Sequence, residues 1–174
     1  VYVFGYVYIK SGKNQNSNWV TLKYNSAGTQ QWVTTYDGNG NDNSSNGFSD
    51  IPMGMIIDNS GNIIVSGSTY TTTGQFSSQD MTTIKYSSTG SQLWVKTYDG
   101  PTHGYDEVKA ITSDASENIY ITGVTNTTSG NDASTIKYNS SGVQQWEMHY
   151  DGGTGNRTPW NIRVNADGDV YASG

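Results

Sequence analysis

The chain has 174 residues, of which 33% are hydrophobic and 14% charged, and its formal net charge is −6. This acidic balance without a basic cluster provides no phosphate-neutralising surface, so nucleic acid and anionic membranes are not expected as partners. No stretch approaches the roughly 18 consecutive apolar residues that a membrane span needs, so membrane insertion is not expected either. The absence of cysteine excludes a disulfide scaffold and thiol chemistry.

Asparagine, serine, threonine, glycine and tyrosine dominate the composition, whereas leucine occurs only at Leu22 and Leu93. Such a composition predicts an all-β fold with many turns. The most apolar segment, Val1–Ile9, alternates in character and lacks a basic flank, so it predicts a strand and not a signal peptide. Low charge together with abundant polar side chains favours an extracellular protein.

One block of sequence occurs three times and aligns without a gap. Its copies are NWVTLKYNSAGTQQWVTTYDG from Asn18, DMTTIKYSSTGSQLWVKTYDG from Asp80 and DASTIKYNSSGVQQWEMHYDG from Asp132. A second block ends in glycine four times, as VYVFG at Gly5, GNIIVSG at Gly67, ENIYITG at Gly123 and GDVYASG at Gly174. Self-similarity of this kind, at a period of about 50 to 60 residues, indicates a repeat architecture.

The middle copy predicts four short strands in chain order. They are Met53–Asp58, Asn62–Thr69, Met81–Tyr86 and Gln92–Tyr98. The first two are joined by Asn59-Ser60-Gly61 and the last two by a five-residue segment with Gly90, short connections that contain the glycine a hairpin turn needs. Consecutive strands are therefore expected to be antiparallel.

A four-stranded antiparallel unit repeated at this period predicts the blades of a β-propeller. The expected organisation is one propeller segment over residues 1–174, with repeats at about 1–50, 51–105 and 106–157 and a partial blade at 158–174. Three blades are fewer than the four to eight with which propellers close. The chain also starts inside a second strand without an initiator methionine, so we expect a fragment of a longer protein; the alternative is head-to-tail assembly, for example two chains making six blades.

Aromatic residues recur at fixed places in the repeat. Ile84 and Tyr86 are expected on one face of the third strand and Lys85 on the other. Trp32, Trp94 and Trp146 recur on the fourth strand. Because they recur in every repeat, we expect these rings to pack between neighbouring blades and not to stack on a ligand.

The blocks T-I-K-Y-[NS]-S-[ST]-G-x-Q-x-W and [DN]-x-x-[GE]-[ND]-[IV]-[IY]-x-[ST]-G resemble the SBBP-type β-propeller repeat of bacterial and archaeal surface proteins. The resemblance covers essentially the whole chain and implies an extracellular or cell-surface propeller, often one module of a longer protein. The G-x-Q-x-W segments also resemble the tryptophan-docking motif of pyrroloquinoline-quinone dehydrogenases. That family's chemistry needs an aspartate base, a calcium site and commonly a vicinal cysteine pair, and this sequence has no cysteine.

The longest connections, between the second and third strands and between repeats, are expected as loops at one end of the blades, where binding residues concentrate on rigid scaffolds. The candidate ligand-facing loop residues are His103, Tyr105, Asp106, Asn131, Asp132 and Trp160. His103 has no second ligand at metal-binding spacing, and His149 stands at a variable strand position. Asp58, Asp114 and Asn165 are expected to cap turns and not to bind calcium.

The sequence thus predicts no catalytic residue, metal or cofactor. The first functional hypothesis is a non-enzymatic surface module for structure or protein contact, whose partners are other blades of the same protein, identical chains, or a protein or glycan at the long-loop face. The second is a carbohydrate-binding propeller, which depends on exposed Tyr105 and Trp160. The third is part of a propeller enzyme whose paired carboxylates, metal or cofactor lie partly in other blades.

Overall fold

The computed structural model describes residues 1–11, 14–38, 50–73, 76–153 and 157–174, which form strands and turns. The strands are β1 (Tyr2–Ser11), β2 (Asn14–Tyr24), β3 (Gln30–Tyr36), β4 (Ile51–Ile57), β5 (Ile63–Thr73), β6 (Phe76–Tyr86), β7 (Gln92–Tyr98), β8 (Asp106–Ser113), β9 (Ile119–Thr127), β10 (Gly130–Tyr138), β11 (Gln144–Tyr150), β12 (Asn161–Val164) and β13 (Val170–Ser173). The expected all-β class is confirmed. Within the described residues, no helix has the length and apolar character needed to cross a membrane.

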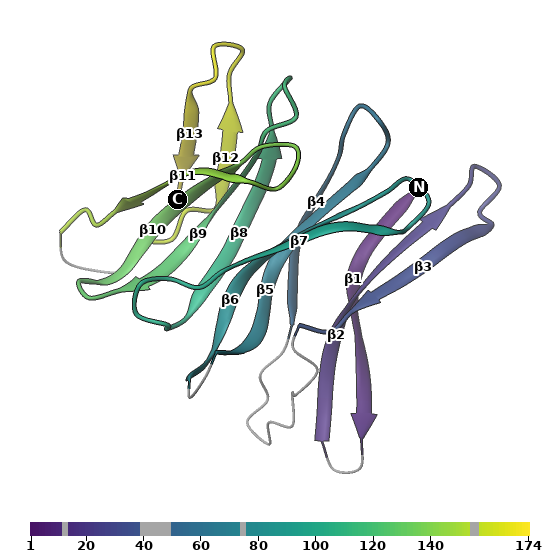
Figure 1. The fold of residues 1–174 in the computed structure, drawn as a ribbon, viewed down its shortest axis with the longest axis horizontal. Coiled ribbons are helices and arrows are strands. Elements are labelled where there is room, and N and C mark those ends of the chain that lie inside the picture. Colours follow the sequence, from purple (N-terminus) through teal and green to yellow (C-terminus); the bar gives the residue numbers. More distant parts are fainter. Residues whose placement is uncertain (12–13, 39–49, 74–75, 154–156) are drawn as a thin grey trace.

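The strands form four antiparallel sheets that follow one another along the chain (Figure 1). We call them the first sheet (β1–β3), second sheet (β4–β7), third sheet (β8–β11) and fourth sheet (β12–β13). In every sheet each strand is hydrogen-bonded to its neighbour in sequence. The prediction of a four-stranded antiparallel unit is confirmed for the second and third sheets.

Short turns close the hairpins as the sequence predicts. The Asp58 Oδ1 atom accepts hydrogen bonds from the backbone N–H groups of Ser60 (3.0 Å) and Asn62 (2.8 Å). Gly61 adopts a φ of 76° in the same turn, a conformation that glycine adopts without steric cost. Asp114 and Asn165 make the equivalent bonds in their turns, so the prediction that these residues cap turns is confirmed.

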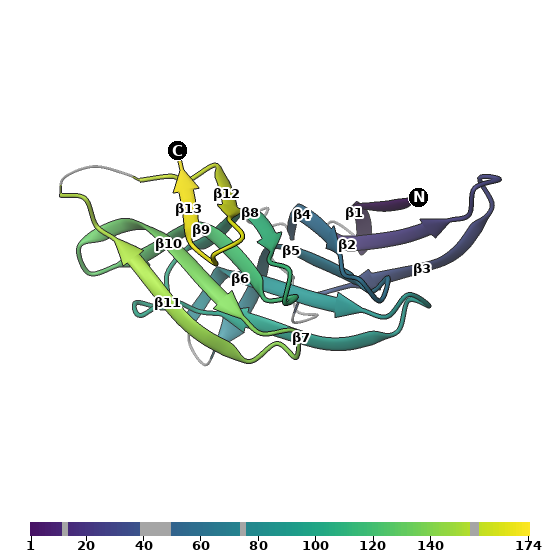
Figure 2. The ribbon, with the colours of Figure 1, turned by 90° about the horizontal axis from the view of Figure 1, so that it is seen from above.

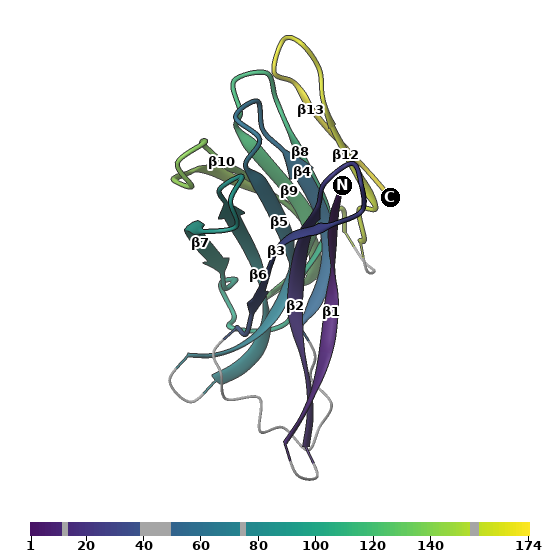
Figure 3. The ribbon, with the colours of Figure 1, turned by 90° about the vertical axis from the view of Figure 1, so that its right-hand side faces the viewer.

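The connections between the second and third strands of each repeat are not the long loops that we expected. β1 continues to Ser11 before β2 begins at Asn14, and β5 continues to Thr73 before β6 begins at Phe76. Tyrosine and threonine favour strands, and the antiparallel ladders of these segments satisfy their backbone groups. The result is a set of long hairpins that extend from one end of the sheets (Figure 3).

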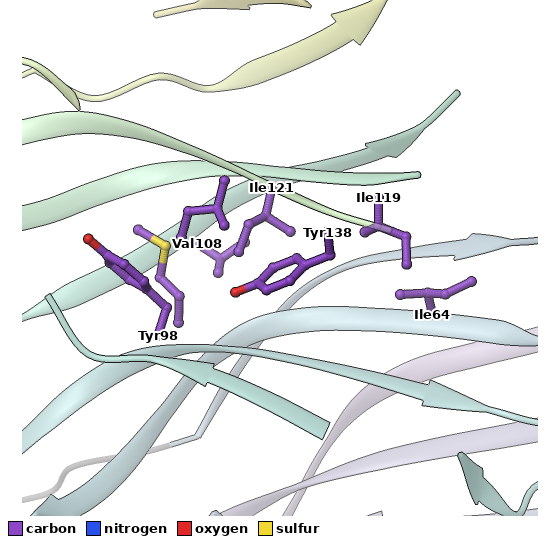
Figure 4. Packing of buried hydrophobic residues seen from close by; sticks show 8 residues of the cluster. Ile64, Tyr98, Val108, Ile119, Ile121 and Tyr138 are labelled. Atoms are coloured by element: carbon purple, nitrogen blue, oxygen red, sulfur yellow. The ribbon is translucent and has the colours of Figure 1, made fainter. Parts of the chain in front are cut away.

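Two buried clusters hold the first three sheets together. The first lies between the first and second sheets and contains Trp19, Ile63, Val65, Ile84 and Tyr86. The second lies between the second and third sheets and contains Ile64, Met81, Tyr98, Val108, Ile119, Ile121, Ile136 and Tyr138 (Figure 4). Burying each of these aliphatic side chains contributes roughly 2 kcal/mol. Ile84 and Tyr86 face the first sheet, as the alternation in their strand predicts.

We call the contact between two successive sheets a joint, and the same polar contacts recur in the first two joints. In the joint between the first and second sheets, Trp32 Nε1 (3.1 Å) and Lys23 Nζ (2.9 Å) both donate to the carbonyl oxygen of Ser88. Gly90 lies against the Trp32 ring, so that a Cβ atom there would be 2.8 Å from the indole. The expected packing of this tryptophan between repeats is confirmed.

The joint between the second and third sheets repeats these contacts. Trp94 Nε1 and Lys85 Nζ both donate to the carbonyl oxygen of Ser140 at 3.3 Å, and Gly142 lies against the Trp94 ring. Lys85 also forms a buried ion pair of 2.8 Å with Asp58. The lysine, tryptophan and turn glycine of the repeated block therefore belong to one contact between sheets.

A glycine in the second strand of each repeat lets the first strand approach closely. A Cβ atom at Gly67 would lie 2.2 Å from the carbonyl oxygen of Ile51, and one at Gly123 would lie 1.9 Å from that of Glu107. The facing strands, β4 and β8, each contain a bulge at this point. The bulge turns the backbone toward the partner strand, which explains why no side chain fits here.

Candidate functional site

Three aspartates meet at the joint between the second and third sheets. Asp80 lies on β6, Asp99 follows β7, and Asp106 begins β8. Because Met81 pairs with Tyr98, the next position along the same two strands places Asp80 beside Asp99. One carboxylate oxygen of each of the three residues lies within 4.8 Å of the others.

Asp106 ties the end of the second sheet to the start of the third. Its Oδ2 atom accepts a hydrogen bond from the Gly100 backbone N–H (2.6 Å), and its Oδ1 atom accepts one from the Asn126 backbone N–H (3.2 Å). A Cβ atom at Gly100 would lie 2.7 Å from Asp106 Oδ1, so the glycine of the Tyr-Asp-Gly triplet makes room for the carboxylate. This part of the arrangement has a purely structural explanation.

Asp50 makes the same contacts at the joint between the first and second sheets. Its carboxylate accepts hydrogen bonds from the backbone N–H groups of Tyr70 (3.0 Å) and Gly38 (3.4 Å). The recurrence indicates that an aspartate just before or at the start of the first strand is a structural element of the repeat. We call Asp80, Asp99 and Asp106 together the acidic cluster; Asp106 therefore has a structural role besides its place in that cluster.

Two of the three aspartates, Asp80 and Asp106, are buried, and Asp99 is partly exposed. Asp106 has no exposed surface and Asp80 has 1%. The pKa of Asp106 is raised to about 7: burial is the main cause, the Asp80 and Asp99 carboxylates act in the same direction, and the hydrogen bonds from Gly100 and Asn126 act against them. Burial also raises the pKa of Asp80, against the hydrogen bonds that Thr71 and Ser78 donate to it. A proton on Asp106 would reduce the repulsion among the three groups.

Asp99 connects the acidic cluster to the surface. Its Oδ2 atom lies 2.7 Å from His103 Nδ1, and this hydrogen bond, with the aspartate's charge, raises the pKa of His103. The Asp99 Oδ1 atom is buried and has no hydrogen-bond partner among the described residues. His103 itself is exposed and adopts a φ of 52°.

The acidic cluster has two chemical possibilities. Three carboxylates can share protons, or they can offer oxygen ligands to a hard cation such as Ca²⁺. Hydrolysis of a glycoside would require the two carboxylates to reach the sugar on either side of its bond, and Asp80 and Asp106 are too deeply buried for that contact.

The equivalent positions at the other joints carry different charges. Asn18 and Asp132 stand where Asp80 does in the repeated block, and Asp37 and Asp151 stand where Asp99 does. Asp50 and Arg157 occupy the place of Asp106, at the same distance from their turn-capping residues. Three acids therefore come together at the middle joint alone among these three sets.

The six residues predicted to face a ligand are distributed over different parts of the structure. His103 and Asp106 join the acidic cluster, and Tyr105 lies between them in sequence with 43% of its surface exposed. Asn131 and Asp132 lie on β10 and not in a loop, which corrects the prediction. Their side chains bond within the β9–β10 hairpin, to Asn126 and to Thr127 respectively.

Trp160 precedes β12 and does not belong to the acidic cluster. It is 62% exposed, and Lys109 Nζ lies 4.7 Å from its ring centroid. Asp80 and Asp99 are the members of the acidic cluster that the sequence reasoning missed. Asp99 recurs in all three copies of the repeated block and Asp80 in two of them, with Asn18 in the first. Spacing alone does not show that two sheets bring them together with Asp106.

A serine on β10 and a histidine and a glutamate on β11 also lie in a row on the third sheet. Ser134 Oγ lies 2.9 Å from His149 Nδ1, and His149 Nε2 lies 3.5 Å from Glu147 Oε1. Ser134 is only 1% exposed, so its hydroxyl is not accessible as a nucleophile. Tyr98 OH, 3.4 Å from His149 Nε2, connects this row to the second sheet and gives the histidine a role in the joint.

Comparison with known proteins does not identify the chain: no protein-family model matches its sequence, and no curated protein matches it. The functional conclusion therefore depends on the sheets, their joints and the surfaces that they expose.

Proposed function

We propose that the chain is part of a β-propeller of the extracellular or cell-surface type and serves as a non-enzymatic scaffold for protein contact. The observation that carries the proposal is the repeated joint, in which a tryptophan and a lysine of one sheet donate to a single turn carbonyl of the next. If each joint has the same geometry, each sheet is placed on the preceding one in the same orientation, as a radial arrangement requires.

The order of the strands supports the same arrangement. β4, β8 and β12, the first strands of their sheets, run along one side of the molecule, and β3, β7 and β11 run along the other (Figure 2). β8 contacts both β4 and β12. In a propeller the first strand of each blade faces the central axis, so these strands would line it. The resemblance to the SBBP-type repeat points to the same architecture and to the surface of a bacterial or archaeal cell.

The long hairpins provide the surface through which such a scaffold would bind. They extend from one end of the sheets (Figure 3), and their sequences are rich in serine, threonine and asparagine. Hydroxyl and amide side chains can donate and accept hydrogen bonds to a partner.

Carbohydrate binding is the second candidate, and the exposure of Trp160 favours it. Aromatic rings that remain accessible can stack on the apolar face of a sugar ring, and Trp160 and Tyr105 are both exposed. A glycan array tests this: binding that is lost in Trp160→Ala and kept in Leu93→Ala, an exposed apolar residue of β7, would replace the scaffold proposal by a lectin.

Electron microscopy of the native protein tests the propeller itself. Class averages with sheets arranged around a central axis are the expected result, and a linear stack of sheets without such an axis would overturn it. Labelling intact cells with an antibody against the chain tests the location. Signal that appears only after the cells are opened would contradict display at the surface.

A further inference from the structure

Four Asn-x-Ser/Thr tripeptides occur in the chain, at Asn43, Asn126, Asn139 and Asn156. This tripeptide is the acceptor of N-linked glycans when it lies at the surface of an exported protein. A chain rich in asparagine, serine and threonine contains several copies by composition alone, so the sequence does not separate an acceptor from a chance occurrence. Asn43 and Asn156 lie outside the described residues, and the structure distinguishes the other two.

Asn139 begins the turn between β10 and β11. Its Oδ1 atom accepts hydrogen bonds from the backbone N–H groups of Ser141 (3.0 Å) and Val143 (2.9 Å). The first bond makes an Asx turn, in which an asparagine side chain binds the backbone two residues further along. The residue at that place is the second serine of the Asn-Ser-Ser tripeptide. The turn therefore fixes the amide group of the acceptor against the residue that carries the required hydroxyl.

The amide nitrogen of Asn139 is not used by this turn. It makes no hydrogen bond to any residue that the structure describes, and it is not buried. Ser141 and Val143 beside it are exposed. A sugar bonded to Nδ2 takes the place of one N–H group, so modification here costs no protein hydrogen bond and meets open surface.

Asn126 has the same tripeptide in the opposite environment. It lies within β9 and is paired with Asn131 of β10. Its Nδ2 atom donates to Asn131 Oδ1 (3.0 Å), and its Oδ1 atom accepts from Thr102 Oγ1 (2.8 Å). A Cβ atom at Gly104 would lie 2.5 Å from that Oδ1 atom, so the side chain is also closely packed. A sugar on Nδ2 would compete with these contacts.

The two tripeptides lie at opposite ends of the third sheet. Asn126 is close to the β9–β10 hairpin, at the end from which the hairpins extend, whereas Asn139 follows the other end of β10. The nine residues of β10, at about 3.3 Å each, place the two ends about 30 Å apart. A glycan on Asn139 therefore leaves the long hairpins uncovered for the protein contact proposed above.

The first sheet has the same turn without the acceptor sequence. Asn25 Oδ1 accepts hydrogen bonds from the backbone N–H groups of Ala27 (3.0 Å) and Thr29 (2.9 Å), in the arrangement found at Asn139. The three residues are exposed. The tripeptide here is Asn-Ser-Ala, so the hydroxyl group two residues after the asparagine is missing. The two turns thus separate the effect of the sequence from that of the conformation.

We propose that Asn139 is a site of N-linked glycosylation and that its Asx turn selects it over Asn126. In the transfer, Nδ2 displaces the lipid-phosphate leaving group from the anomeric carbon of a lipid-linked oligosaccharide. An N–C bond forms, a C–O bond breaks, and the amide group releases one proton. The transferase and the donor belong to the cell that exports the chain. The inference rests on the proposed extracellular or cell-surface location, because N-linked glycans are added to exported proteins.

Peptide mass spectrometry of the chain purified from the cells that produce it tests the proposal. Fragmentation must keep the glycan on its asparagine, because Asn139 and Asn156 fall in one tryptic peptide. Ser141→Ala removes the hydroxyl group and keeps the backbone N–H that bonds to Asn139, whereas Ala27→Ser completes the tripeptide in the equivalent turn. Val143→Ala is the matched control, since it changes an exposed side chain of the same turn outside the tripeptide. Unfolding midpoints confirm that each variant is folded.

The expected result is a glycan on Asn139 in the wild-type chain and the control, its complete loss in Ser141→Ala, and a new glycan on Asn25 in Ala27→Ser. Asn126 should be unmodified in all four proteins. An unmodified Asn139 in the wild type, or a glycan that persists in Ser141→Ala, would overturn the site. Modification of Asn126 to the same extent, or an unmodified Asn25 in Ala27→Ser, would overturn selection by the turn.

Antibody labelling of the same cells separates failure of this inference from failure of the proposed function. Signal on intact cells together with an unmodified Asn139 overturns the glycosylation site and leaves the proposed location intact. Signal that appears only in opened cells, together with an unmodified Asn139, overturns both.

Discussion

Replacing Asp106 by asparagine tests whether the acidic cluster makes the stability of the protein depend on pH. The folded protein holds the pKa of Asp106 at about 7, against 3.8 for an unperturbed aspartate. The folded state therefore binds a proton more tightly than the unfolded state. Stability is highest below the unfolded pKa, falls as pH rises from about 4 to 7, and is constant above that range.

The size of the effect follows from the shift. One pKa unit corresponds to about 1.4 kcal/mol, so a shift of about three units corresponds to roughly 4 kcal/mol as an upper bound. Asparagine has nearly the shape of a protonated aspartate and carries no charge. Its amide nitrogen cannot accept one of the two backbone N–H bonds that the Asp106 oxygens accept, so the Asp106→Asn variant should be less stable than the wild type at pH 4.5 by about 1–2 kcal/mol. Between pH 4.5 and pH 8 the difference should shift in favour of the variant by up to about 4 kcal/mol.

Urea unfolding followed by tryptophan fluorescence, at several pH values between 4.5 and 8, measures the difference between the two proteins. EDTA is present throughout, because a divalent cation would stabilise the ionised cluster and conceal the effect. Asp50→Asn is the matched control, since it removes the same kind of contact where Asn18 replaces Asp80, and its pH dependence should be smaller. A constant difference between Asp106→Asn and the wild type at every pH would refute the reasoning.

Three further substitutions test the joints, each by its effect on the free energy of unfolding. Gly123→Ala places a Cβ atom 1.9 Å from a carbonyl oxygen and should cost at least about 3 kcal/mol. Gly5→Ala places its Cβ atom in open space and should cost less than about 0.5 kcal/mol. Equal costs for the two variants would contradict the steric argument. Trp94→Phe removes the hydrogen bond to Ser140 and should cost about 1–2 kcal/mol, and no loss would show that the indole N–H adds nothing. Lys85→Met breaks a buried ion pair and should cost about 3 kcal/mol; a cost below about 1 kcal/mol would contradict the importance of the pair.

The sheets were predictable because their signals are local. Alternation and turn glycines mark β5–β7 within one or two residues at most boundaries, and the recurrence of Trp32 and Trp94 marked the joint. The long hairpins were not predictable, because a run such as Tyr70–Thr73 has strand propensity without the apolar alternation that distinguishes a strand from a polar loop.

The acidic cluster could not be predicted for a different reason. Asp80, Asp99 and Asp106 are ordinary strand-end or turn residues when they are considered one at a time, and Asp80 and Asp106 belong to different sheets. Only the docking of the third sheet on the second brings the three carboxylates together. The spacing of residues along the chain does not predict that contact. The position of His103 close to acidic residues, by contrast, was visible in the sequence.

The unequal charges at the three joints have a consequence for folding. Nearly identical repeats can dock in the wrong order, since the apolar contacts between any two of them are alike, and misassembly of this kind is a characteristic failure of repeat proteins. The charged and polar residues differ from joint to joint: Asn18 stands at the first, three acids at the second and Arg157 at the third. Each pair of docking surfaces therefore has its own charge pattern. A sheet that skipped its neighbour would bury an uncompensated charge or lose a favourable one, so these few polar positions favour the correct order of assembly.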